Sequence, residues 1–212
     1  MKTKRLSYYF LKNETTRRFY GTSATVLGLV NSFFIISYLS VFHFGMYQLM
    51  LSLIAILEGF SAGFFNDVVV IEMRRCLNVG KISWVKRLFW EHAVLKIIIS
   101  MLLIGVIYGG SGAVSHFYGD NVALFLKIDS VLLIIHTLRL LEFTLLKSAM
   151  IFSYWAYPMI RELTKLVLII GLVVFFQLTV VSIIAVHVMA EIMALGVITV
   201  RSFVKTYSSI LG

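Results

Sequence analysis

The 212-residue chain has little cysteine, proline or charge. Cys76 is its only cysteine, which excludes an internal disulfide. Pro158 is its only proline, so few helices can be kinked or broken by this residue type. Charged residues make up 14% of the chain and hydrophobic residues 60%, with a mean hydropathy of +0.95. These values are typical of membrane proteins rather than of soluble domains.

Charge is missing above all from one long stretch, since no Asp, Glu, Lys or Arg lies between Arg18 and Glu58. A helix needs about 20 residues to cross the hydrocarbon core, so this stretch suits two crossings. We place the break between them at His43-Phe44-Gly45, and a second break, in the last apolar run, at Gln177-Leu178-Thr179. The expected fold class is all-α, a polytopic membrane protein with six transmembrane helices in one bundle. The expected spans are residues 22–41, 46–66, 88–109, 124–146, 154–176 and 179–199, within a bundle at 21–205 flanked by a basic, aromatic tail at 1–20 and a second tail at 206–212.

Basic residues fall next to every second connector of this arrangement. Lys and Arg near span ends are retained on the cytoplasmic side, so both termini are expected on that side. The expected location is the prokaryotic cell (inner) membrane. A five-span arrangement would place Arg201 and Lys205 outside and is ranked second. Only three of the nineteen Lys and Arg residues lie away from the expected cytoplasmic ends: Lys96, Lys127 and Arg139.

The formal net charge of +9 is explained by this topology and by anionic lipid headgroups, so membrane lipids are expected partners. Nucleic acid is not an expected partner, because the basic residues flank the spans and form no single patch. No metal or cofactor is expected.

Polar residues inside the apolar spans are the best guide to function, because a charge at the bilayer centre costs about 2.5–3.5 kcal/mol on insertion scales. They are expected to face protein or water. Arg139 is the strongest candidate, as a permanently charged bidentate donor suited to phosphate or carboxylate. The candidates for a substrate path are Asn31, Lys96, Asp129, His136, Arg139 and Glu142, and those for a coupling ion are Glu58, His187 and Glu191.

Spacing predicts which of these residues share a helix face. Arg139 and Glu142, three apart, are expected to pair. His92, Lys96 and Ser100 form a stripe at four-residue intervals. The alternative for each residue is pairing within the bundle, which would only set helix register. Two glycine pairs have the spacing of close helix packing, Gly59 with Gly63 and Gly105 with Gly109.

Four segments, in their order and spacing, resemble one family of transporters. They are Phe44-Gly45-Met46-Tyr47, the run from Glu72-Met73-Arg74-Arg75 to Gly80-Lys81, His116-Phe117-Tyr118-Gly119-Asp120, and Arg161-Glu162-Leu163. The chain is similar to the polysaccharide flippases, the Wzx-type O-antigen and teichoic-acid exporters of the MATE-like multidrug and oligosaccharidyl-lipid exporter superfamily.

The resemblance implies that the chain flips lipid-linked oligosaccharides across the membrane by alternating access between two helix bundles. Arg139, Lys96 and His136 would then face the pyrophosphate or acidic sugars. Such exporters have twelve or fourteen spans, so this chain would supply one six-helix half. The second bundle would be absent because the chain is a fragment, would come from a separate chain of a split gene, or would come from another copy in a parallel homodimer.

Enzyme activity is not expected, because the sequence contains no His-Glu-x-x-His, P-loop or Gly-x-Ser-x-Gly motif. A membrane scaffold or assembly subunit that carries out no transport is the stronger alternative. Loss of the buried charges would stop a flippase and leave a scaffold working.

Overall fold

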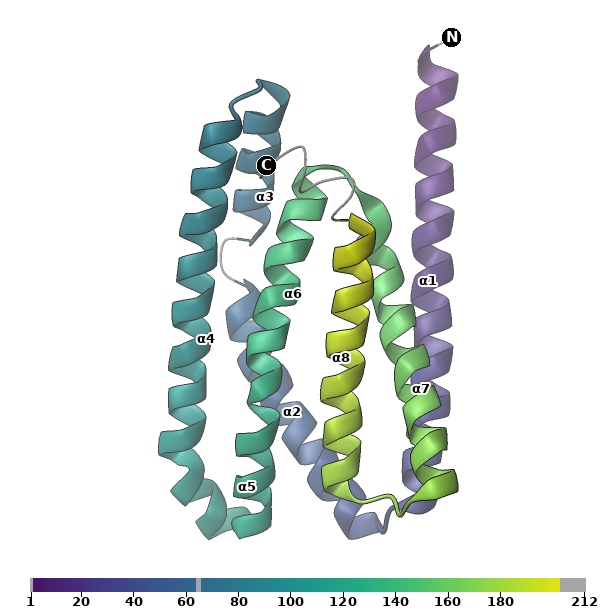
Figure 1. The fold of residues 1–212 in the computed structure, drawn as a ribbon, viewed down its shortest axis with the longest axis vertical. Helices are drawn as coiled ribbons and strands as arrows, with labels where there is room; N and C mark the ends of the chain where they lie inside the picture. The colour runs from purple at the N-terminus through teal and green to yellow at the C-terminus, as the bar shows by residue number, and fades with distance from the viewer. Residues whose placement is uncertain (1, 64–65, 203–212) are drawn as a thin grey trace.

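The computed structural model describes residues 2–63 and 66–202, and every regular element among them is helical. Figure 1 shows long helices running along one axis. The elements are α1 (Lys2–Tyr38), α2 (Val41–Gly63), α3 (Asn66–Asn78), α4 (Ile82–Tyr118), α5 (Asp120–Asp129), α6 (Val131–Ser148), the short 3-10 helix η1 (Phe152–Ala156), α7 (Tyr157–Phe175) and α8 (Val180–Ser202).

Local hydrogen bonds decide where the apolar runs break. The expected break at 43–45 is wrong, because these residues belong to the first turns of α2 and the chain turns at Leu39-Ser40. Ser40 Oγ accepts from the backbone N–H of His43 at 3.3 Å, which caps the new helix. The expected break at 177–179 is confirmed. There, Thr179 and Ser182 exchange side-chain and backbone hydrogen bonds of 2.9 and 3.2 Å that cap α8.

Other expected boundaries need correction. The span expected at 124–146 is divided between α5 and α6, which meet at Ser130. The tail expected at 1–20 continues into the first span, since residues 2–20 are the first half of α1. The tail at 206–212 lies outside the described residues. Pro158 occupies the first turn of α7, where its missing N–H has no helical partner to lose, so it starts this helix.

Four helical segments are long and apolar enough to cross a membrane: Glu14–Tyr38, Val41–Phe60, Ile82–Tyr118 and Val180–Ser202. The composition of α6 and α7 sets them apart, because each carries three charged residues. By length and composition, the chain is therefore a helical membrane protein with at least these four candidate spans among its described residues.

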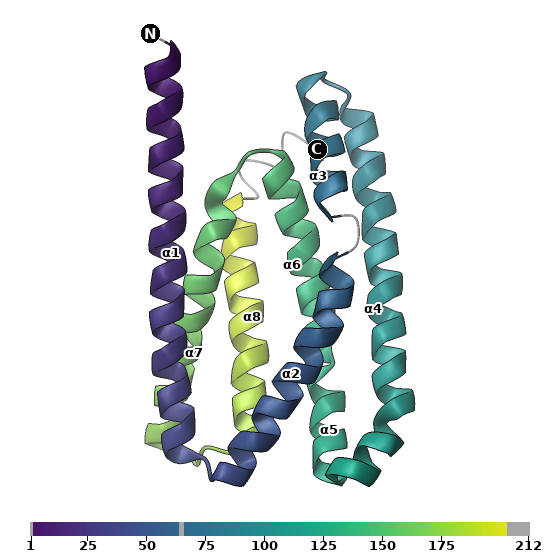
Figure 2. The same ribbon diagram turned by 180° about the vertical axis from the view of Figure 1, so that it is seen from behind.

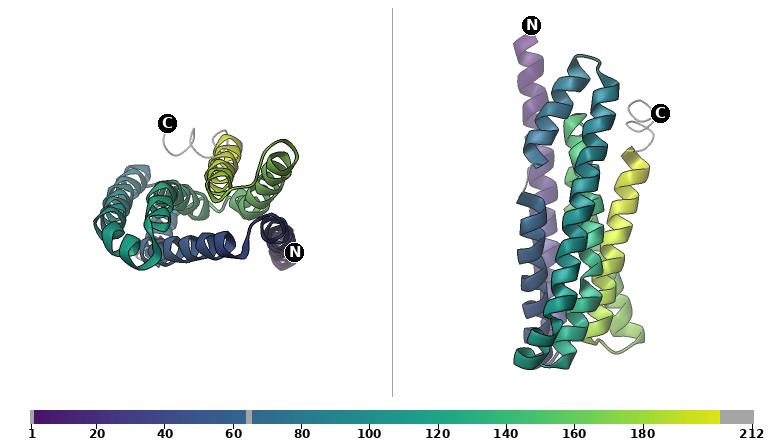
Figure 3. Two further views of the ribbon diagram at one scale, coloured as in Figure 1. Left: turned by 90° about the horizontal axis from the view of Figure 1, so that it is seen from below. Right: turned by 90° about the vertical axis from the view of Figure 1, so that its left-hand side faces the viewer.

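The helices form two groups joined by α2. Helices α1, α7 and α8 lie together, α3 to α6 form the other side, and α2 crosses obliquely between the two groups (Figures 1 and 2). The view along the bundle shows the same two groups of helices with α2 between them (Figure 3). The N-terminal end of α1 and the C-terminal end of α8 lie at the same end of the bundle (Figure 1).

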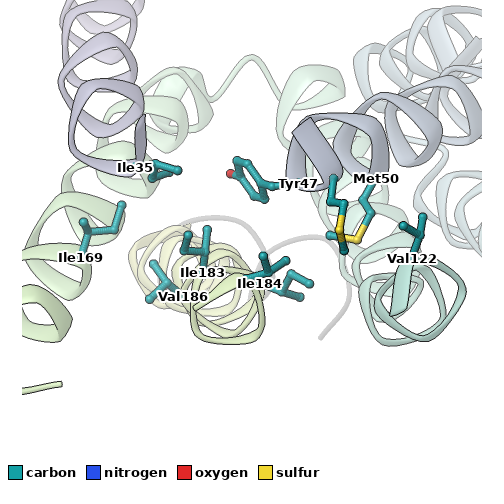
Figure 4. Close-up of a cluster of buried hydrophobic side chains, with 10 residues drawn as sticks. Ile35, Tyr47, Met50, Val122, Ile169, Ile183, Ile184 and Val186 are labelled. Atoms are coloured by element: carbon teal, nitrogen blue, oxygen red, sulfur yellow. The ribbon is translucent and has the colours of Figure 1, made fainter. Parts of the chain in front are cut away.

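Apolar packing closes the space between the groups near the connectors. Ile35 of α1, Met50 of α2, Ile169 of α7 and Ile183 of α8 belong to one buried cluster (Figure 4). Three of the glycines expected at close helix contacts are not used this way within the described part of the chain. No atom there lies within 4 Å of the position a Cβ would take at Gly59, Gly105 or Gly109, and the surroundings of Gly63 lie outside what is described.

Candidate functional site

Glu191 of α8 lies at the centre of a buried network of charged side chains. Its side chain is 1% exposed. Tyr157 donates its hydroxyl to Glu191 Oε2. Arg161 Nη1 lies 3.1 Å from Oε1, and Arg139 Nη1 lies 3.6 Å from Oε2. His136 Nε2 is 3.4 Å from Oε1. One carboxylate thus connects α6, α7 and α8.

Arg139 and His136 of α6 extend the network to α2. Arg139 Nη2 pairs with Glu58 Oε1, and His136 Nδ1 lies 2.8 Å from Glu58 Oε2. Both residues therefore bridge Glu58 and Glu191. The expected Arg139–Glu142 pair is wrong, because the guanidinium turns to other helices and Glu142 accepts from Thr199 Oγ1 at 3.0 Å.

A second carboxylate, that of Glu162 on α7, is paired with donors from α1 and α7. Arg161 Nη2 lies 2.7 Å and Lys165 Nζ 3.2 Å from Glu162 Oε1. Asn31 of α1 donates from Nδ2 to Glu162 Oε2 and to the backbone oxygen of Glu162, each at 2.9 Å. Arg161 touches both Glu162 and Glu191, so the network is continuous from α1 to α2.

The formal charges of the network nearly cancel. Three carboxylates face two arginine guanidinium groups and one lysine side chain, and the imidazole of His136 lies among them. Pairing of this kind makes charges tolerable away from water, whereas removal of one partner leaves a buried charge uncompensated. The carboxylates are Glu58, Glu162 and Glu191, and the cations are Arg139, Arg161 and Lys165.

A cavity of about 360 Å³ adjoins the network between α1, α2, α7 and α8. Glu162 and Lys165 line one side, and Tyr47 and His187 line another. His187 Nδ1 lies 3.4 Å from Tyr47 Oη. Asn31 also lines the cavity and is 3% exposed, yet its Oδ1 has no hydrogen-bond partner among the described residues. The cavity therefore offers donors and acceptors to a polar guest.

The other candidates lie apart from this cavity. Lys96, Asp129, Glu142 and His136 are buried without lining it. Arg139 of the network is partly buried and does not line it either. The stripe of His92, Lys96 and Ser100 is buried on α4 as expected. Ser100 Oγ donates to the Leu133 carbonyl at 3.1 Å, so this stripe faces α6.

Sequence reasoning missed four residues of the network, all on α7. Arg161 and Lys165 were counted only among the basic residues near the expected cytoplasmic span ends, and Glu162 entered only through a resemblance. Spacing could have revealed them, because Tyr157, Arg161 and Lys165 recur every four residues and so share a helix face.

Two of the proposed coupling-ion residues, Glu58 and Glu191, are held by arginines, while His187 lines the cavity. No group of three or more His, Cys, Asp or Glu residues that could hold a metal ion occurs in the searched part of the chain, residues 2–63 and 66–202.

Comparison with family models, curated proteins and solved structures finds no match. The resemblance to polysaccharide flippases therefore stays a prediction, and the function has to be argued from the site.

Replacement of Tyr157 by phenylalanine tests the network without changing charge. The variant loses the hydroxyl that donates to Glu191, and hydrogen bonds to charged groups contribute about 1.5–3 kcal/mol. We expect a loss of stability of that size, measured by thermal unfolding in detergent. Tyr154→Phe is the matched control, because Tyr154 packs against Phe143 with its ring. Equal stability of the two variants would contradict the hydrogen bond.

Proposed function

We propose that the chain is one bundle of a membrane transporter that flips lipid-linked oligosaccharide precursors across the membrane by alternating access. The observation that carries the proposal is the polar cavity between α1, α2, α7 and α8, beside a buried ion network. A soluble core would have little use for such a cavity inside apolar helices. A transporter needs one, because a polar substrate has to exchange its water for protein groups within the bilayer.

The proposal includes six crossings, with α6 and α7 added to the four apolar candidates. Their 18 and 19 residues give lengths of about 27–29 Å, close to the hydrocarbon thickness. Their charged side chains turn inward to the network. Their outward residues are apolar, such as Leu138 of α6 and Val167 of α7, 48% and 62% exposed.

The cavity suits the glycan part of such a substrate. Its volume lies within the range of about 300–1,000 Å³ found for ligand pockets. Asn31 and Gln48 supply amide groups, and the Glu162–Lys165 pair supplies an acceptor and a donor with no net charge. The polyprenyl tail would remain with the acyl chains along the apolar outer faces.

The position of the pyrophosphate is revised within this proposal. Arg139 already faces Glu58 and Glu191, so a phosphate would compete with two carboxylates for its guanidinium. Lys165 is the cation that lines the cavity, with two of its three N–H groups left for a substrate beyond the bond to Glu162. We therefore assign the first anionic contact to Lys165.

Filling the cavity tests the proposal. Ser32 lines the cavity and Phe33, the next residue, is 69% exposed on the outer face of α1. We expect Ser32→Trp to stop transfer of a fluorescent polyprenyl-pyrophosphate sugar between the leaflets of liposomes, because the indole occupies the path. Phe33→Trp should transfer the lipid as the unchanged protein does. Full transfer by Ser32→Trp, or no transfer by the unchanged protein, would contradict the flippase.

A membrane scaffold is the second candidate, and the pairing of the network charges favours it. Every carboxylate of the network has at least one cationic partner, an arrangement that also serves simply to set helix register. A scaffold would bind its partners equally well with Ser32→Trp.

A further inference from the structure

We infer that two copies of this chain associate side by side through the outer face of α2, which brings their cavities together. The inference rests on the proposed function, because a transporter built from one bundle needs a second. It names the partner, a second copy of the chain, and the surface that binds it.

A stripe along the outer face of α2 carries small and polar residues, and large apolar side chains such as Ile56 and Phe60 are exposed beside it. Every residue of this stripe is exposed, while Met46, Tyr47, Met50 and Ile54 of the same helix point inward and are buried. We call the outward set the α2 stripe, and its residues follow one another at intervals of three and four: Gly45, Gln48, Ser52, Ala55 and Gly59.

Helix α4 shows how a lipid-facing surface of this protein looks. Its exposed residues at middle depth are large and apolar, including Ile98, Met101 and Leu102, between 51% and 65% exposed. The α2 stripe lacks such residues at its central positions. Small residues instead let a second helix approach closely, which is how transmembrane helices gain packing contacts.

No part of the described chain covers the stripe. A Cβ placed at Gly45 or Gly59 would meet no atom within 4 Å. Figure 2 shows α2 crossing the near side of the molecule with no helix in front of it. The Gln48 side-chain amide makes no hydrogen bond within the described residues, which is costly for an amide facing acyl chains.

A second observation marks the same face as incomplete. The cavity opens there, since exposed Thr25 and Ser32 of α1 and exposed Gln48 of α2 line it. Inside, the Oδ1 atom of Asn31 is buried and unpartnered. A neighbouring chain would cover the opening and bring polar groups to Gln48.

The chemistry of the stripe favours a second copy as the neighbour. A glutamine amide is both donor and acceptor, so Gln48 can pair with Gln48 of an identical chain. Intervals of three and four match the same intervals on a parallel copy related by an axis along the membrane normal. Interhelical hydrogen bonds of this kind contribute about 1–2 kcal/mol in transmembrane peptides.

Cysteine cross-linking in membranes tests the interface. Cys76→Ser removes the only native thiol, and Ser52→Cys then places one thiol on the stripe. A disulfide forms only where the Cα atoms come within about 7 Å, so oxidation reports direct contact. We expect a cross-linked dimer from Ser52→Cys and none from the matched control Met101→Cys on α4, which is 56% exposed.

Gly109→Cys tests α4 as an alternative interface, because a Cβ at Gly109 would also meet no atom within 4 Å. A dimer through Gly109→Cys with none through Ser52→Cys would overturn the inference. So would an absence of dimer in every variant.

A second variant tests the polar contact itself. Gln48 is exposed in the single chain, so Gln48→Leu is expected to leave the fold intact and to lower the dimer association constant about tenfold, since about 1.4 kcal/mol corresponds to a factor of ten in that constant. Subunit counting by photobleaching in liposomes measures the dimer fraction that gives this constant. An unchanged fraction would contradict a Gln48 contact at the interface.

The outcomes separate the interface from the proposed function. Cross-linked dimers that transfer no lipid would support the interface and contradict the flippase. Lipid transfer by protein that stays monomeric would support the flippase and overturn the interface.

Discussion

Replacement of Glu191 by alanine is expected to lower the free energy of unfolding by about 3–5 kcal/mol, because it removes a buried carboxylate and leaves Arg139 and Arg161 with one carboxylate partner each. Arg161 and Arg139 would each lose an ion pair, and Tyr157 would lose its acceptor. For a chain of this size the midpoint of thermal unfolding should fall by on the order of 10 °C. Thermal unfolding in detergent micelles measures the change.

Two further variants show whether the loss of stability comes from the missing carboxylate. Glu191→Gln keeps the shape and an oxygen that can accept from Tyr157, so we expect a smaller loss than for alanine. Glu72→Ala is the control, because the Glu72 side chain is 47% exposed and its Oε1 lies as far as 3.9 Å from Arg75 Nη1. Substitutions at such surface positions change the free energy of unfolding by no more than about 0.5 kcal/mol. If Glu191→Ala unfolds like Glu72→Ala, the network does not hold α8 in place.

Replacement of Arg139 by methionine has the second largest expected effect. Glu58 would then keep only the imidazole of His136, whereas Glu191 would keep Arg161, so we expect a loss of about 3–5 kcal/mol from the uncompensated Glu58 carboxylate. Adding Glu58→Leu removes this carboxylate and should restore part of the stability. A double-mutant cycle on thermal unfolding gives the coupling energy of the Arg139–Glu58 pair.

The Arg139 cycle also bears on function. A variant that folds poorly loses transport for a structural reason, so transport by Arg139→Met says nothing about substrate contact unless its folding is measured as well. The doubly substituted chain separates the two effects, since it lacks Arg139 and should fold better. Coupling near zero would contradict the ion pair and leave Arg139 available to a substrate.

The network explains why the buried charges are expected to matter more for stability than for binding. They are connected to one another across α2, α6, α7 and α8, whereas the cavity is reached through Asn31, Glu162, Lys165 and His187. Asn31, Glu162 and Lys165 belong to both. Substitutions in the cavity are therefore expected to affect transport, and those around Glu191 to affect folding.

Much of the helical arrangement could be predicted from the sequence, because apolar run length and charge decide which segments can enter a bilayer. The connector at 177–179 and the starting role of Pro158 follow from local chemistry that needs no knowledge of neighbours. The turn at Leu39-Ser40 was missed because the apolar run continues through it, and a serine cap at the start of α2, rather than a loss of hydrophobicity, marks the break.

By itself, the sequence determined an all-helical chain with apolar spans and with polar groups such as Asn31, Lys96 and Glu191 turned away from lipid. Only the tertiary structure decided which charged side chains pair with one another. Spacing along one helix suggested Arg139 with Glu142, but the guanidinium lies against Glu58 and Glu191 on other helices. Periodicity defines which residues share a face, whereas the rotation and crossing of neighbouring helices define what that face meets.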